Sequence, residues 1–165
     1  MHHRTLATTL VALILAGCAT YDKPVPDNYS GPTVSISDSG EVKSSSLVHI
    51  FELTGADEKR FGGSHLATIV QNQGKGFSQS PVIITNKIPA KDMRVTLKAA
   101  TVYAAPILAM MNPTCRVQGE VQFQPREGAS YRVTGLISPE QCAVWVEDLA
   151  TNLPVTEKIV DKGTK

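Results

Sequence analysis

The chain has 165 residues, with 16 lysines and arginines against 15 aspartates and glutamates, for a net charge of +1. This length is enough for one domain with a sizeable core. The balanced charge excludes the strongly basic surface that would draw the protein to nucleic acid or to anionic lipid, so we expect no nucleic-acid partner.

The first element is a short apolar run over residues 5–16, which carry no charge. One positive charge, Arg4, precedes this run. About a dozen apolar residues are too few to cross a hydrocarbon core as a helix, which takes about 20. Such a run, ending in small residues, is typical of a secretory signal peptide. We therefore predict a signal peptide over residues 1–17.

The residues Leu15-Ala16-Gly17-Cys18 resemble the lipobox of bacterial lipoproteins. The resemblance implies a diacylglyceryl thioether on Cys18, cleavage before it and acylation of its new amine. Several acyl chains would hold the protein firmly in a bilayer. In the best-known sorting rule of this family, alanine at the next position, here Ala19, permits export. We expect a protein anchored in the cell outer membrane through Cys18, facing the periplasm or the surface. The alternative is an ordinary secretion signal in which Cys18 is incidental.

Residues 18–32 contain three prolines and few apolar side chains, which predicts a lipidated flexible tether. At full extension about fourteen residues reach roughly 45 Å, so the domain could stand off the membrane.

From Thr33 onward the apolar residues alternate with a period of two, which indicates half-buried strands. In the clearest strand, Val117, Val121 and Phe123 point one way and polar side chains the other. The turn "PREGA" is predicted to join this strand to the next as a hairpin. Predicted strands cover residues 33–37, 47–53, 82–88, 93–99, 116–124, 130–138, 144–146 and 155–160.

Eight or so short, closely spaced strands favour an antiparallel β-sandwich over residues 33–160, with a polar tail at 161–165. One segment differs, because "SHLATIVQNQG" places Leu66, Ile69 and Val70 at helical spacing. Ser64 suits an N-cap and Gly74 the position after the last turn. We therefore predict one short helix in a mainly β domain.

Four stretches resemble a known kind of module: "VHIFELTGADEKRF", "NKIPAKDMRVTLKA", "VQFQPREGASYRVTG" and "VWVEDLATNLPV". They are similar to the turn and core patterns of small bacterial lipoproteins whose domain is akin to PEGA-type surface modules. They lie between Val48 and Val155, and the resemblance extends over about two-thirds of the chain after Cys18. The resemblance implies an antiparallel β-sandwich at a cell surface, with no known catalytic residues.

Two cysteines, Cys115 and Cys142, remain in the domain. In an oxidising compartment an even pair favours a disulfide, and the alternative is two buried free thiols. If the strands before and after "PREGA" share one sheet with the strand that follows Cys142, the two cysteines lie two strand spacings apart, about 9.5 Å. A disulfide needs Cα atoms within about 7 Å. The bond therefore requires loop curvature or a third strand that crosses to the other sheet.

No residue pattern predicts catalysis, a cofactor or a metal site. His49 lies among apolar strand residues, and the remaining histidines and cysteines lack the spacing of metal ligands. The stretch "GKGFSQS" lacks the order of a P-loop. We therefore expect a non-catalytic interaction or scaffold module, and as the alternative a module that binds carbohydrate or another cell-wall ligand.

The longest apolar run of the domain, Ala104 to Met111, has two interpretations. It is a core strand or packed turn, or it exposes a patch for a protein partner, since methionine-rich surfaces adapt to partners. The residues of this partner patch would be Ile107, Leu108, Met110 and Met111. The oligomeric state is left open by the sequence.

Overall fold

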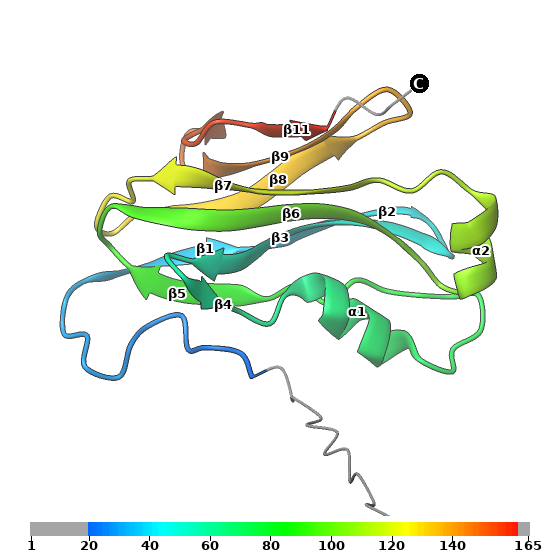
Figure 1. Ribbon diagram of the computed structural model, residues 1–165, viewed down its shortest axis with the longest axis horizontal. Helices are drawn as coiled ribbons and strands as arrows, with labels where there is room; N and C mark the ends of the chain where they lie inside the picture. Colours follow the sequence, from blue (N-terminus) through cyan, green and yellow to red (C-terminus); the bar gives the residue numbers. More distant parts are fainter. Residues whose placement is uncertain (1–19, 162–165) are drawn as a thin grey trace, which may run out of the picture.

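The computed structural model describes residues 20–161 as two β-sheets packed face to face, with helices on one side and at one end (Figure 1). This architecture confirms the predicted mainly β sandwich. Across the core, one sheet contributes β3 (Leu47–Ala56), β6 (Met93–Tyr103) and β7 (Arg116–Phe123), and they face β8 (Ser130–Ile137) and β9 (Cys142–Asp148) of the other.

Sheet A has the strand order β10-β9-β8-β1-β5, and β11 also pairs with β9. All its pairings are antiparallel except that of β1 with β8, which is parallel. Its strands are β1 (Thr33–Ser37), β5 (Thr85–Pro89), β8 (Ser130–Ile137), β9 (Cys142–Asp148), β10 (Leu153–Pro154) and β11 (Ile159–Asp161).

Sheet B has the order β2-β3-β6-β7, and β4 returns alongside β3. The edge strand β2 was not predicted, because it consists mainly of exposed polar and small residues and has no apolar alternation. The strands are β2 (Ser39–Ser44), β3 (Leu47–Ala56), β4 (Lys59–Arg60), β6 (Met93–Tyr103) and β7 (Arg116–Phe123).

The core lies between the sheets and uses the alternating faces predicted from the sequence. On β6 the inward side chains are Met93, Val95, Leu97 and Ala99, all buried. Phe123 of β7 meets Tyr131 of β8 edge-to-face, with ring centroids 4.9 Å apart. Burial of these two faces against each other is what holds the sheets together.

The predicted hairpin through "PREGA" is wrong. β7 pairs with β6 in sheet B, whereas β8 pairs with β1 and β9 in sheet A. The turn instead carries the chain across the sandwich, and the Arg126 N–H donates to the Tyr131 hydroxyl there at 2.8 Å. Periodicity showed which residues face inward, and both a hairpin and a crossing satisfy that pattern.

Two helices are present where one was predicted. The predicted helix is α1 (Ser64–Asn72), which packs on β3 and β6 on the outer face of sheet B. The second helix, α2 (Pro106–Met111), occupies the apolar run that we expected to be a strand, a turn or a surface patch, at one end of the sandwich (Figure 1). Proline at its start suits the first turn of a helix.

Candidate functional site

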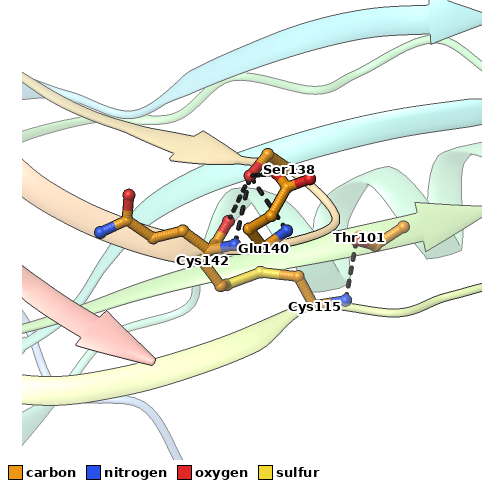
Figure 2. Close-up of a disulfide and its surroundings, with 6 residues drawn as sticks. Thr101, Cys115, Ser138, Glu140 and Cys142 are labelled. Atoms are coloured by element: carbon orange, nitrogen blue, oxygen red, sulfur yellow. Dashed lines mark hydrogen bonds between the residues drawn. A yellow bond between two sulfur atoms is a disulfide. The ribbon is translucent and has the colours of Figure 1, made fainter. Parts of the chain in front are cut away.

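The disulfide joins the two sheets. Cys115 precedes β7 of sheet B and Cys142 begins β9 of sheet A, with 5.9 Å between their Cα atoms (Figure 2). That separation lies within the usual range for a disulfide. The lateral problem foreseen from the sequence does not arise, because the chain crosses between sheets after β7. The Cys115 N–H also donates to Thr101 Oγ1 of β6 at 3.1 Å, which fixes this end of the bond.

Helix α1 packs with its polar side inward. Its buried residues are Ser64, Thr68 and Asn72, one turn apart. Its large apolar residues, Leu66, Ile69 and Val70, are exposed. Helices on globular domains usually show the opposite arrangement, with the apolar stripe against the core.

The inward polar stripe of α1 is held by hydrogen bonds to residues 80–82, in the segment that precedes β5. Thr68 Oγ1 accepts from the Val82 N–H at 2.9 Å. Asn72 Nδ2 donates to the Ser80 carbonyl at 2.8 Å, and Asn72 Oδ1 accepts from the Ser80 N–H at 3.1 Å. These bonds satisfy buried polar groups that would otherwise destabilise the fold. The orientation of α1 is therefore fixed by specific contacts.

Two buried carboxylates hold the first turn of α1. Asp38 Oδ2 accepts from the Ser64 hydroxyl at 2.6 Å and from the Ser64 N–H at 3.3 Å. Glu52 Oε2 accepts from the His65 N–H at 2.7 Å. A Cβ at Gly63 would clash with the Glu52 carboxylate, so a glycine is needed there. Negative charge at a helix N-terminus is favourable, and these residues replace a side-chain cap.

The pKa of Asp38 is raised from 3.8 to about 6, mainly by burial and to a smaller extent by the nearby charge of Glu52. Its hydrogen bonds from Ser64 and from the Leu53 N–H oppose that rise. Burial thus destabilises the ionised form of this carboxyl.

Glu52 also forms a buried ion pair with Lys98 of β6, with Oε1 2.6 Å from Nζ. Both side chains point to the outer face of sheet B, where α1 covers them. Sequence reasoning missed Asp38, Glu52 and Lys98, since a charged residue on the outer face of a strand is usually solvated. The spacing of Ser64, Thr68 and Asn72 by four residues was the available sign that a polar surface lay beneath α1.

A polar hollow of about 480 Å³ opens beside this ion pair, between the start of α1 and the outer face of β7. Tyr21, half exposed, forms part of its rim and packs over Gly62. The hollow therefore combines an aromatic ring with amide, hydroxyl and charged groups. Its other polar lining residues include Thr54, Arg60, His65, Thr96, Arg116, Gln118 and Glu120.

The predicted partner patch lies on α2 and faces outward. Met110 is 82% exposed and Met111 is 75% exposed, Ile107 is also exposed, and Leu108 is partly buried. None of the residues of α2 is buried. A second hollow, also of about 480 Å³ and mainly apolar, separates α2 from α1.

The lipid-attachment residue predicted from the sequence, Cys18, lies outside the described residues 20–161. The segment just after it is fastened to β4. The Asp22 N–H donates to the Arg60 carbonyl at 2.8 Å, and Asp22 Oδ2 accepts from the Arg60 N–H at 2.9 Å. This two-way contact joins the predicted tether to the domain four residues after Cys18.

His49 is a buried residue of β3, as a strand histidine is expected to be, and Glu41 of β2 lies 3.7 Å from its Nδ1. Burial lowers the pKa of His49, and the neighbouring Glu41 opposes this effect.

Among residues 20–161, no three His, Cys, Asp or Glu side chains gather closely enough to hold a metal ion. Neither helix in that range has the length and hydrophobicity needed to span a membrane. Comparison with known protein families, with curated proteins and with solved structures finds no match to this chain. A proposal for its function therefore rests on the motifs and the geometry above.

Proposed function

We propose that the protein is a non-catalytic, lipid-anchored envelope protein whose β-sandwich is an interaction module at the periplasmic side of the outer membrane. The lipobox-like residues before Cys18 support the anchor. The observation that carries the interaction role is the exposure of α2. Met110 and Met111 are the most exposed large apolar side chains of the described chain.

The α2 patch suits a protein partner for physical reasons. Methionine is flexible and polarisable, so it adapts to an apolar partner surface. Solvent exposure of such side chains is unfavourable, and their burial in a complex contributes about 25 cal/mol per Å² of apolar surface. The sandwich core is complete without α2, because none of its residues belongs to the core cluster. Its apolar composition is therefore not explained by packing in that core.

The anchor is tested with Cys18→Ser expressed in a Gram-negative bacterium. The wild-type protein is expected to incorporate labelled palmitate and to fractionate with outer membrane. The variant is expected to lose the label and to accumulate as uncleaved precursor. A variant that still takes up palmitate and reaches the outer membrane contradicts the anchor.

The partner surface is tested with Met110→Ser combined with Met111→Ser. We expect crosslinking in intact cells to lose a specific partner, while the melting temperature stays within a few degrees of wild type. Leu153→Ser on β10 is the matched control, since Leu153 is 62% exposed and lies at the outer edge of sheet A. Partner loss in the control, or a large drop in melting temperature in the double variant, argues against the patch.

A second function, binding of carbohydrate or another cell-wall ligand, is favoured by the polar hollow. Tyr21 offers a ring on which a sugar can stack, and Gln118 and Glu120 offer hydrogen-bonding groups. Binding of isolated peptidoglycan fragments by the wild-type protein, lost in Tyr21→Ala and kept in Leu153→Ser, would support it. Equal retention by all three proteins would contradict it.

A further inference from the structure

The outward face of α1 is an apolar surface that the fold itself does not use. Leu66, Ile69 and Val70 form this surface on the helix, and Phe77, in the loop that follows, is 63% exposed. Val70 is 57% exposed. The polar contacts of Thr68 and Asn72 prevent the helix from rotating this surface inward. An amphipathic helix whose apolar face points away from its own domain is the arrangement of helices that lie in a bilayer interface.

The segment that carries α1 also lacks negative charge. From Phe61 to Ser80, α1 and the loop after it contain one lysine, Lys75, and no aspartate or glutamate. Bacterial phospholipid surfaces are anionic, and acidic side chains would be repelled from them. The net charge of the whole chain is close to neutral, but the charge of this surface is compatible with lipid headgroups.

The proposed lipid site lies within reach of α1. Asp22 is fastened to Arg60, and Tyr21 packs over Gly62, two residues before the first residue of α1. Four residue steps separate Cys18 from Asp22, and they span at most about 14 Å. In Figure 1 the start of the described chain and α1 lie on the same side of the sandwich. A bilayer that holds the lipid on Cys18 is therefore close to the N-terminal end of α1.

We propose that the apolar face of α1, with Phe77, rests in the interfacial region of the bilayer that carries the lipid anchor. Sheet B then faces the membrane and sheet A faces away from it. The domain lies on the bilayer surface, so the stand-off of about 45 Å allowed by a fully extended tether is not used. The inference rests on the proposed anchor, and it adds a second, weaker membrane contact that fixes the orientation of the domain.

The test uses the mature, lipidated protein reconstituted into vesicles of phosphatidylethanolamine and phosphatidylglycerol. Val70→Cys supplies one free thiol for an environment-sensitive fluorophore, because Cys115 and Cys142 are disulfide-bonded. Leu153→Cys, at a similarly exposed position on sheet A, is the matched control. Lipids with a quencher in the acyl chain then report which fluorophore touches the bilayer. Flotation of the same vesicles reports the anchor independently.

We expect the fluorophore at position 70 to shift to the blue and to be quenched several-fold more than the one at position 153. Equal quenching of the two, or none in protein that floats with the vesicles, overturns the inference and leaves the anchor intact. Protein that does not float overturns the anchor, and the membrane contact with it. A second measurement compares how accessible the α1 side and the sheet A side of the domain are to a water-soluble label. Val70→Asp should remove the difference between these two sides, with an unchanged melting temperature. An unchanged accessibility pattern contradicts the contact.

Discussion

The carboxyl of Asp38 is buried, and we predict that it makes the free energy of unfolding depend on pH. It accepts hydrogen bonds from the Leu53 and Ser64 N–H groups and from the Ser64 hydroxyl, and it is almost fully shielded from solvent. The charge of Glu52 contributes to the raised pKa of Asp38, and Glu52 itself pairs with Lys98. The perturbation is Asp38→Asn, which keeps the shape of the side chain and removes its titration.

The direction of this pH dependence follows from how many protons the folded and the unfolded protein bind. The pKa of Asp38 is about 6 in the folded protein and 3.8 in the absence of the fold, so the folded state binds more protons between these values. Stability from this group is therefore fully present below about pH 4 and is lost as the pH rises through about 6. A difference of about two units corresponds to roughly 3 kcal/mol of unfolding free energy.

The assay is urea unfolding of wild type and Asp38→Asn with the disulfide intact, followed by the fluorescence of Trp145 between pH 4 and 7.5. The difference between the two proteins isolates Asp38, because burial also lowers the pKa of His49 and His65 and so lowers stability as the pH falls. We expect the advantage of wild type over the variant to grow by up to about 3 kcal/mol from pH 7.5 to pH 4. A difference that stays flat over this range would refute the reasoning.

Two other predictions concern the bonds that hold the outer layers. Removing the disulfide with Cys115→Ala and Cys142→Ala should lower the unfolding free energy by about 3 to 4 kcal/mol, because the bond closes a loop of about 28 residues. A thiol count on the denatured, unreduced wild-type mature protein should find no free thiol. Glu52→Gln should cost about 3 to 5 kcal/mol in urea unfolding, because it leaves the Lys98 charge buried without its partner, and Lys98→Met in the same chain should restore most of it. Glu120→Gln, in an exposed pair with Arg94, is the control and should cost less than about 1 kcal/mol; an equal loss would contradict the role of burial.

The inward faces of the sandwich were predictable because they depend on a local pattern. Alternation identified the buried side of β6 and of β7, since a strand packed on a core repeats every two residues. The sheet to which each strand belongs was not predictable in this way. β7 and β8 have the faces of a hairpin, yet they lie in different sheets, and only long-range packing such as that of Phe123 on Tyr131 distinguishes the two arrangements.

The candidate sites were less predictable than the core. α2 lacks the length for a periodic pattern, so its apolar run suited a core strand equally well. Asp38 and Glu52 are separated from α1 in the sequence, and their roles exist only after the helix has been placed on sheet B. The existence of α1 follows from spacing, and its C-terminal end from Gly74, which adopts a positive φ of 77° after the last turn. The predicted N-cap at Ser64 is wrong by one residue, because Gly63 is the N-cap and Ser64 begins the helix. The rotation of α1 about its own axis does not follow from the sequence pattern.

The orientation of α1 connects the buried polar network to the proposed membrane contact. If α1 were rotated so that Leu66, Ile69 and Val70 faced sheet B, each side chain would contribute up to about 1.5 to 3 kcal/mol on full burial. The rotation would also remove the acceptors and donors that Thr68 and Asn72 give to the segment of Val82 and Ser80. It would place apolar groups against the Glu52–Lys98 pair, where unsatisfied charges are very unfavourable. The charged outer face of sheet B thus selects the polar side of the helix and forces the apolar side outward. In an unattached domain such an apolar surface lowers solubility. With the proposed lipid anchor a few residues away, the same surface would give the domain a second contact with the bilayer.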